Sequence, residues 1–513
     1  MTNSTSSLPP TPPTADTAGR RRLVLAVVSA GLLLCGIDLT VLHAAVPSMS
    51  RELRPSSTEL LWIIDVYSLT LAALLVTCGT LGDRIGRKRM VLTGFALFGL
   101  ASAAAGLSES TPQLIAARML LGAGAAMIMA STVAIIRVVF TDARERAVAI
   151  GVWTAAHSVG ATIGPLVGGL VTERWGWGAA FLINVPVALV ILVVGFLVIP
   201  ESRTPRPRTW DLAGVALSAT GLTVVVFALK RGGEHAGPDL LAALAAVTGA
   251  ALLYAFVRRQ RRSAEPLLDL SLFADRRFVT ATLCVVGCFG SYVALLFFLT
   301  QWLQQVGGFA PVAAGLALIP LAAANAVGAT TAPRVSARWG NRWSLTGALV
   351  LFAGAMALMA LVGDTGAYPL LVAPLVAAGY GAGIVMTLGA DSIMSAADPD
   401  RSGEAAAIQE TSFELGAGLG VAVLGTLLTA SYRLTMPDTP GLSGTDRDAL
   451  TESFSSAEEL AGRLEPPEAG RLLGAARSAY DHGFTTVAVC TSAALAATAA
   501  LAAALLRPRP AAR

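Results

Sequence analysis

Long apolar runs separated by short polar loops are the feature that most constrains how this chain can fold. Fourteen such runs begin near residues 23, 59, 90, 112, 146, 177, 210, 239, 278, 311, 343, 369, 402 and 482. About 20 apolar residues are enough for a helix to cross a bilayer. Only 14% of the 513 residues are charged, whereas soluble domains carry about a quarter. We therefore predict an all-α polytopic membrane protein with fourteen transmembrane helices.

The distribution of basic residues predicts the orientation of these helices, because Lys and Arg concentrate on cytoplasmic loops. With the N-terminus inside, the inner segments hold 25 of the 37 basic residues and the short outer loops hold five. The long outer segment 431–480 holds another five, and long loops are largely exempt from the rule. We predict that both termini are cytoplasmic. The run from Leu23 to Val46 is too long for a cleaved signal peptide and is expected to remain as the first helix.

Two basic loops suggest that the chain contains an internal repeat, as many transporters do. The loop "GDRIGRKR" is echoed by "SARWGNRW" at a constant offset of 254 residues, pairing Arg84 with Arg338, Gly86 with Gly340 and Lys88 with Arg342. Chance similarity of two basic loops is the alternative. The repeat predicts an N-terminal six-helix bundle (23–200), two inserted helices with linkers (201–277) and a C-terminal six-helix bundle (278–506). The last bundle includes a long extracellular loop (431–480). Cytoplasmic tails are expected at both ends, a disordered one at 1–22 and a short one at 507–513. In the long loop, short amphipathic helices broken at Pro466 and Pro467 are expected.

Four ordered motifs carry a resemblance to a known family. They are "IDLTVLHAAVP" from Ile37, "GTLGDRIGRKR" from Gly79, "RMLLGAGAA" from Arg118 and "GATIGPLVGG" from Gly160, with "FLINVP" from Phe181 as a further match. On these residues the chain resembles the major facilitator superfamily, in its fourteen-helix drug:proton antiporter branch. The nearest likeness is to the staphylococcal exporter of quaternary ammonium antiseptics. The resemblance implies two six-helix bundles, alternating access, proton-motive force as the driver, and bulky lipophilic, often cationic, substrates at the cell membrane.

The charged motif after the second run has two interpretations. Asp83, Arg84 and Arg87 form either a solvated basic loop that sets the topology or a conformational switch. In the switch, Asp83 bonds an arginine or a neighbouring helix end in one state of the transport cycle and releases it in the other. Gly86 would permit the tight turn between them. We favour the switch because the motif is nearly complete.

Small residues on the fifth helix form a second element of the predicted switch. Gly164 and Pro165 lie on a face of glycines, and such faces let helix backbones approach closely. A proline that follows a glycine also supplies a bend, which this helix would need in order to pivot against its partner in the other half.

Charged residues deep in the apolar runs are the candidates for proton coupling: Asp38, Arg118 and Glu410. An intramembrane arginine normally pairs with an acid or faces a wet cavity. We expect Arg118 to pair with Asp38, since both lie in the outer halves of their helices. Snorkelling of Arg118 to the interface is the alternative.

Two acids on the thirteenth run provide the chemistry of exchange. Glu410 and Glu414 are four residues apart and share one helix face. Two ionised carboxylates placed this way would repel each other, so at least one should hold a proton when no cation is present. Such an acid can exchange its proton for a cation. Glu404 follows Ser402 at the helix start and is expected to cap it.

The predicted substrate-binding residues are acids, an amide and aromatics near mid-membrane: Asp65, Glu410, Glu414, Phe413, Trp62 and Asn325. Aromatic faces attract delocalised cations, and ordinary packing is the alternative for each ring. Asn325 stands where the antiseptic exporter carries an acid, which implies weaker binding of divalent cations or the use of Asp391 instead. Asp391 lies near the cytoplasmic interface, where we expect it to be solvated.

These features predict a proton-coupled multidrug exporter of lipophilic cations such as antiseptics, dyes and antibiotics. The alternative is a dedicated exporter of one natural-product antibiotic for self-resistance, since the Ala-rich, Lys-poor composition is typical of a high-GC genome. ATP-driven transport needs a Gly-Lys-Ser/Thr loop, and neither Lys88 nor Lys230 follows a glycine. The five cysteines lie in apolar runs without a C-x-x-C pair, which argues against a zinc site. We expect no enzymatic activity, cofactor, metal or nucleic-acid partner, and a functional monomer.

Overall fold

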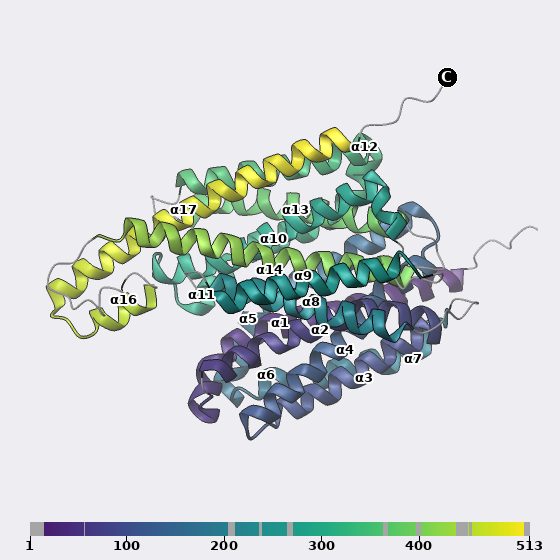
Figure 1. Ribbon diagram of the computed structural model, residues 1–513, viewed down its shortest axis with the longest axis horizontal. Helices are drawn as coiled ribbons and strands as arrows, with labels where there is room; N and C mark the ends of the chain where they lie inside the picture. Colours follow the sequence, from purple (N-terminus) through teal and green to yellow (C-terminus); the bar gives the residue numbers. More distant parts are fainter. Residues whose placement is uncertain are drawn as a thin grey trace, which may run out of the picture.

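The helices of this protein run side by side along its long axis, as Figure 1 shows for the computed structural model. The structure describes residues 15–55, 57–203, 211–234, 239–263, 270–362, 368–396, 402–437, 450 and 454–506. This part of the chain consists of helices and loops, without strands. Hydrocarbon offers no water to backbone N–H and C=O groups, and a helix satisfies nearly all of them within one segment. The all-α prediction is confirmed.

The N-terminal half contains α1 (Ala15–Leu53), α2 (Ser57–Ile85), α3 (Arg87–Gly106), α4 (Thr111–Val139), α5 (Ala143–Trp175), α6 (Ala179–Leu182) and α7 (Asn184–Val198). The inserted pair is α8 (Leu212–Glu234) and α9 (Leu240–Gln260). The C-terminal half contains the 3-10 helix η1 (Leu270–Ala274), then α10 (Arg276–Gln305), α11 (Pro311–Ala317), α12 (Ile319–Val362), α13 (Tyr368–Ala396), α14 (Ser402–Thr435), α16 (Phe454–Ala461) and α17 (Pro466–Leu505).

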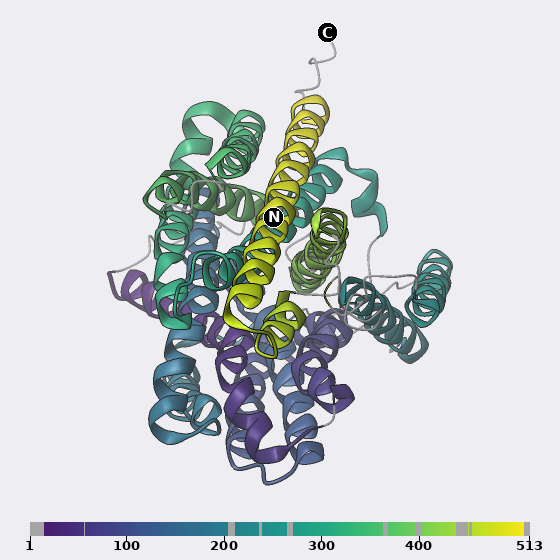
Figure 2. The ribbon, with the colours of Figure 1, turned by 90° about the vertical axis from the view of Figure 1, so that its left-hand side faces the viewer.

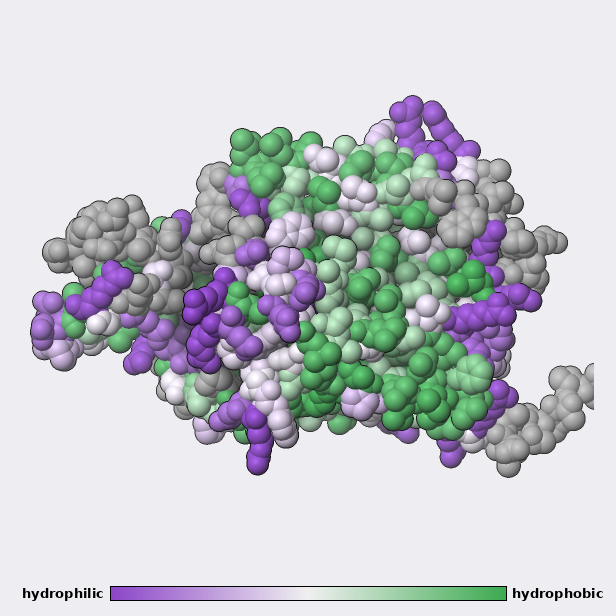
Figure 3. All heavy atoms as spheres, turned by 90° about the horizontal axis from the view of Figure 1, so that it is seen from below, coloured by the Kyte–Doolittle hydropathy of each residue, from purple (hydrophilic) through white to green (hydrophobic). Residues whose placement is uncertain are grey.

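The described helices have the length and surface of a multi-pass membrane protein. Eleven of their segments are long and apolar enough to cross a bilayer, and the bent pair Val66–Leu75 and Thr77–Ile85 would make a twelfth. One of the eleven, Val312–Leu361, includes the helix break at Gly340. Figure 3 shows a broad hydrophobic band across the molecule, with hydrophilic residues gathered toward its ends. The number of fourteen spans stays a prediction.

Backbone geometry at matched positions agrees with the predicted internal repeat. Gly86 and Gly340, which are 254 residues apart, both have positive φ, at 114° and 75°. This left-handed region favours glycine because it lacks a Cβ atom. At the same offset, Gly36 of α1 and Gly290 of α10 each lie against the backbone of a neighbouring helix, α5 and α14 respectively. These matched geometries support the internal repeat, which stays a prediction.

Both ends of the described chain lie at the same end of the bundle, which we call the inner end after the predicted orientation. Contacts connect the start of α1, the start of α5, the end of α13, the break in α12 and the end of α17. They are Arg21 Nη1 to Glu145 Oε2 at 2.8 Å, Arg146 Nε to Asp391 Oδ1 at 3.3 Å, Asn341 Nδ2 to Ser392 Oγ at 2.9 Å and Arg342 Nε to Ala503 O at 2.9 Å. Whether this end faces the cytoplasm stays a prediction.

The start of the first helix differs from the sequence prediction. Helix α1 begins at Ala15, so residues 15–22, which we expected in a disordered tail, are helical. Arg20 Nε donates to Val198 O at 3.1 Å, and Arg21 pairs with Glu145. These tertiary contacts stabilise a segment that has no apolar run of its own.

The outer segment before the last helix also differs in part. Helix α17 begins at Pro466 and not near residue 482, because the fixed φ of proline suits the first turn of a helix. The predicted break at the prolines is confirmed, since α16 ends before them. Phe454 of α16 packs edge-on against Tyr480 of α17, with ring centroids 6.1 Å apart. Helix α16 and the first part of α17 project beyond the other helices (Figure 1).

The halves meet where α2 and α4 contact α14 and where α5 contacts α11, α12 and α13. We call the surface between them the seam. Helices α8 and α9 pack against each other, and α8 also contacts α2 and α14 at the edge of the seam. Figure 2 shows the inserted pair at the side of the bundle. The seam positions the candidate site, because α1, α2 and α14 carry most of the deep charged residues.

Candidate functional site

A buried ion pair joins α1 to α4. Arg118 Nη1 lies 3.1 Å from Asp38 Oδ2, and the two residues are 1% and 0% exposed. Arg118 Nε also donates to Ile63 O at 3.1 Å, and Nη2 donates to Ile64 O at 3.4 Å. The predicted pairing is confirmed, and Arg118 does not snorkel. Because the two carbonyls belong to α2, this arginine connects three helices.

The other oxygen of Asp38 is held by a residue that the sequence analysis did not single out. Asn184 Nδ2 donates to Asp38 Oδ1 at 2.8 Å and lies 3.1 Å from Ser102 Oγ. The Ser102 hydroxyl in turn donates to Phe181 O at 2.9 Å. Asn184 lies at the break between α6 and α7, which places its amide against α1. Its position in the "FLINVP" motif was the available signal.

Glu410 on α14 is equally buried but has few partners. Its exposure is 0%, and Gln409 Nε2 donates to its Oε1 at 3.4 Å. Its Oε2 has no hydrogen-bond partner within the part of the chain that the structure describes. A buried carboxylate normally has charged or hydrogen-bonding partners. Glu410 therefore differs from Asp38 in its bonding partners, although both residues are fully buried.

An aromatic and an acidic residue, Phe413 and Glu414, follow Glu410 on the next turn of α14. Phe413 is buried, and its ring centroid lies 4.8 Å from that of Phe289 on α10, with the rings tilted by 45°. Glu414, four residues after Glu410, is half-buried. The two acids and Phe413 thus occupy neighbouring positions on one stretch of helix.

The two acidic centres lie on either side of the seam and have neighbours in common. Cys35 of α1 lies near both Asp38 and Glu410. Tyr67 of α2 lies near both Asp38 and Glu414. Tyr67 also lies under the Arg118 guanidinium, 4.6 Å from ring centroid to Cζ. Residues from both halves therefore converge on one region of the bundle.

The charged motif between α2 and α3 is an ion pair with little exposure. Arg87 Nε and Nη2 donate to Asp83 Oδ1 at 2.9 and 2.6 Å, and the residues are 4% and 7% exposed. Gly86 has a φ of 114°, which confirms the predicted tight turn. Arg84 on the same motif is half-buried. The solvated-loop interpretation is wrong for Asp83 and Arg87, because both are covered.

The small face of α5 packs within the N-terminal half. A side chain at Gly160 would strike the Leu33 backbone, and one at Gly164 would strike Thr40. Gly151 contributes to the contact of α5 with the other half, because it lies against the Ala329 carbonyl of α12. The glycine face of α5 therefore packs against α1. Gly151, nearer the start of α5, packs across the seam.

Polar contacts close the inner end between the halves. Arg146 Nε lies 3.3 Å from Asp391 Oδ1, and its Nη2 lies 3.1 Å from Ser395 Oγ. Arg137 of α4 donates to the Met394 carbonyl. The expectation that solvent surrounds Asp391 is wrong, since its side chain is 25% exposed and pairs with Arg146. The helix arrangement brings this arginine of α5 across to α13, which sequence spacing does not reveal.

Comparison with known proteins identifies the architecture. Residues 28–421 match the family described as Major Facilitator Superfamily.

The chain belongs to the major facilitator superfamily.

Among curated relatives, the chain is 38% identical to the "Multidrug efflux pump LfrA" of Mycolicibacterium smegmatis, over 96% of this chain and 97% of the relative. It is 34% identical to the "Methyl viologen resistance protein SmvA" of Salmonella typhimurium, over 90% and 93%. It is 32% identical to the "Tetracenomycin C resistance and export protein" of Streptomyces glaucescens, over 90% and 86%. The crystal structure of the human organic anion transporter MFSD10 superposes with a TM-score of 0.62 at 16% identity, covering 94% of this chain and 99% of that one.

This facilitator is accordingly a multi-pass protein of the cell (inner) membrane, and its relatives are multidrug efflux or antibiotic resistance proteins. The likeness to the staphylococcal antiseptic exporter stays a prediction. So do the roles of the site residues, although the geometry now shows which of them meet.

Of the remaining predicted residues of this facilitator, Asn325 and Trp62 are described by the structure. Asn325 is 0% exposed, and its Nδ2 lies 3.8 Å from Met386 Sδ, so it packs between α12 and α13. Trp62 on α2 is 44% exposed. The side chains of Asp65, Pro165 and Glu404 lie outside the described residues.

Proposed function

We propose that this facilitator exports lipophilic cations from the cell in exchange for protons, by alternating access. The observation that supports it most is the Glu410 carboxyl, buried at the seam with one oxygen that has no partner among the described residues. Burial penalises a charged carboxylate that has no basic partner. Glu410 is therefore suited to carry a proton when the site is empty and to ionise when a cation arrives.

The surroundings of Glu410 suit a bulky cation with delocalised charge. Phe413 lies three residues after Glu410 on α14 and packs with Phe289 of α10, and aromatic faces attract cations. Glu414 supplies a second acid one turn away, which matches a doubly charged substrate better than one acid alone. One relative is named for resistance to methyl viologen, which is an aromatic dication.

Asp38 and Arg118 would link protonation to movement of the helices. Arg118 bonds Asp38 of α1 and the Ile63 and Ile64 carbonyls of α2. A proton on Asp38 would remove the charge that holds Arg118 to α1, and the arginine, still bonded to the α2 carbonyls, would then be free to shift with α2 relative to α1. Because α2 contacts α14 across the seam, this shift would reach the helix that carries Glu410.

Alternating access requires that the closed inner end opens. The contacts of Arg137 and Arg146 with α13 would break in that step, and the Asp83–Arg87 pair would serve as the neighbouring switch. We propose the two six-helix halves as the rocking units and one chain as the functional unit.

A transport assay with purified protein in liposomes tests this proposal. With an imposed pH gradient, we expect uptake of methyl viologen and of a monovalent dye cation, and we expect a protonophore to stop both. Uptake that ignores the protonophore would refute proton coupling.

The alternative is a dedicated antibiotic exporter, which the 32% identity to the tetracenomycin C export protein favours. In the same liposomes, uptake of one antibiotic with none of the cations would support the alternative and reject multidrug export.

A further inference from the structure

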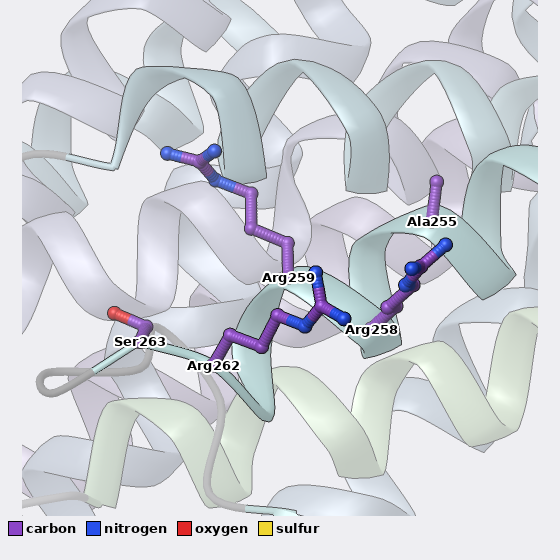
Figure 4. A pocket seen from close by; sticks show the side chains of 5 residues that line it. All are labelled: Ala255, Arg258, Arg259, Arg262 and Ser263. Carbon is purple, nitrogen blue, oxygen red and sulfur yellow. The ribbon is translucent and has the colours of Figure 1, made fainter.

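The inner end of α9 carries a basic hollow that the transport cycle described above does not use. It has a volume of about 410 Å³ and is lined by Ala255, Arg258, Arg259, Arg262 and Ser263. Positions three and four residues apart share one face of a helix, so the four residues from 255 to 262 form a single stripe. Figure 4 shows Arg258 and Arg262 extending in the same direction, while Arg259 turns the other way.

The three arginines are not equivalent in charge pairing. Arg259 Nε lies 2.7 Å from Asp211 Oδ1, and Gln260 Nε2 donates to Asp211 Oδ2 at 3.1 Å. These bonds tie the end of α9 to the start of α8. Arg258 and Arg262 make no ion pair with any residue that the structure describes. Within the part of the chain that the structure describes, the hollow therefore presents two guanidinium groups that no acidic side chain pairs with.

The position of α9 indicates where this anion would come from. Only 11% of its apolar window is buried inside the protein, and large apolar side chains along it are exposed: Leu240, Leu241, Leu244, Val247 and Tyr254. A helix of this kind faces lipid along its length. Its basic end then lies at the depth of the phospholipid headgroups, where anionic lipids supply phosphate.

We propose that this hollow binds the phosphate of an anionic phospholipid headgroup. Arg258 and Arg262 donate charge-assisted hydrogen bonds to the phosphate oxygens, for which the planar guanidinium is well suited. The acyl chains follow the exposed apolar side chains of α9. Arg259 stays with Asp211, which keeps α9 attached to α8 while the lipid is bound.

The bound lipid would attach the inserted pair to the bilayer beside the seam. Helix α8 contacts both α2 and α14, one from each half. Anchoring α9 therefore restrains a pair of helices that spans the moving surface. This inference concerns lipid binding and holds whichever substrate the protein carries.

Native mass spectrometry of the purified full-length protein tests the proposal. We expect phosphatidylglycerol to remain bound where phosphatidylcholine with the same chains is lost. The double variant Arg258→Gln/Arg262→Gln should bind phosphatidylglycerol roughly 30-fold more weakly, since each basic residue near an anionic surface contributes about fivefold. The control Arg174→Gln/Arg477→Gln removes the same charge from exposed residues of α5 and α17 and should bind as the wild type does.

Three results would overturn the proposal. One is equal retention of the two lipids by the wild type, and another is equal loss of phosphatidylglycerol in both double variants. The third is displacement of phosphatidylglycerol by millimolar inorganic phosphate, which would make the hollow a site for free anions. If the double variant does not fold, the single variants Arg258→Gln and Arg262→Gln should each bind about fivefold more weakly, and unchanged binding in both would equally reject the lipid.

Discussion

Asp38 and Glu410 are two fully buried carboxyls, one in each half, and they differ in their hydrogen-bonding partners. Each Asp38 oxygen accepts a hydrogen bond, one from Arg118 and one from Asn184. Glu410 accepts one bond of 3.4 Å from a neutral amide, and its other oxygen has no partner among the described residues. Burial alone therefore does not define the role of an acid in the membrane.

This difference supports the proposal that Glu410, and not Asp38, exchanges its proton for a cation. A buried ion pair is costly to break, because the remaining charge has lost its partner. Asp38 is thus held in a network that connects α1, α2, α4 and α7, and a change in its charge would move helices. Glu410 has no ion pair among the described residues that would break when a cation replaces its proton. This suits direct exchange with substrate.

The largest expected effect comes from removing the exchangeable acid. We expect Glu410→Gln to abolish proton-driven uptake of divalent cations into inside-out vesicles, because an amide neither releases a proton nor carries a negative charge. The protein level should stay normal, since Gln preserves the shape and the neutral state. The exposed Glu458→Gln on α16 is the matched control and should transport as the wild type does. Unchanged transport by Glu410→Gln would remove the proposed role.

A second prediction concerns Asp38, whose two oxygens both accept hydrogen bonds. It separates proton coupling from the stability of the fold. Asp38→Asn should weaken coupling for every substrate and destabilise the fold by about 3–5 kcal/mol, because Arg118 remains charged and buried. The double variant Asp38→Asn/Arg118→Gln should regain much of that stability without regaining coupling. Thermal unfolding in detergent and gradient-driven transport measure the two quantities. If only one substrate class is affected, Asp38 belongs to the binding site.

A third prediction concerns the partner found only in the structure. Asn184→Ala removes the donor to Asp38 Oδ1 and should cost about 1–3 kcal/mol, the usual penalty for leaving a buried acceptor unsatisfied. The exposed Asn341, which bonds Ser392 at the inner end, is the control. Its alanine variant should change the free energy of unfolding by about 0.5 kcal/mol or less. Equal changes in unfolding free energy for the two variants would show that the hydrogen bond from Asn184 to Asp38 stabilises the fold no more than an exposed hydrogen bond does.

The smallest expected effect is at an acid outside the membrane-spanning segments. Partial burial acts to raise the pKa of Asp211, but the hydrogen bonds from the Gly214 amide, Arg259 and Gln260 outweigh it and hold the pKa below its ordinary value. A lowered folded-state pKa means that ionised Asp211 stabilises the fold above its unfolded pKa of about 3.9. This contribution is lost as the pH falls through the folded value.

Comparison of the wild type with Asp211→Asn tests this last prediction. Their difference in unfolding free energy should be about 1 kcal/mol or less, as is usual for exposed ion pairs. It should stay constant from pH 7 to about pH 5 and shrink as the pH falls below about 4. A difference that grows on acidification would contradict the sign of the effect.

Much of the fold could be predicted because its causes are local. Apolar runs predict spanning helices through their length and hydropathy, and the repeat predicted like backbone geometry at Gly86 and Gly340. The Asp38–Arg118 pair was also predictable, since an arginine inside an apolar run needs an acid and few acids were available at that depth. The start of α1 was missed because its stabilising contacts come from residues more than 100 positions away.

The amino-acid sequence by itself determined the helices, their apolar surface, the family and the buried charges that need partners. Only the tertiary structure decided that Asn184 completes the bonding of Asp38, that Asp391 pairs with Arg146, and that Glu410 faces the seam with few partners. The physical reason is that hydropathy and φ preference belong to individual residues and their neighbours in the chain. A hydrogen bond between helices depends on which faces meet, and that is set by the packing of all the helices together.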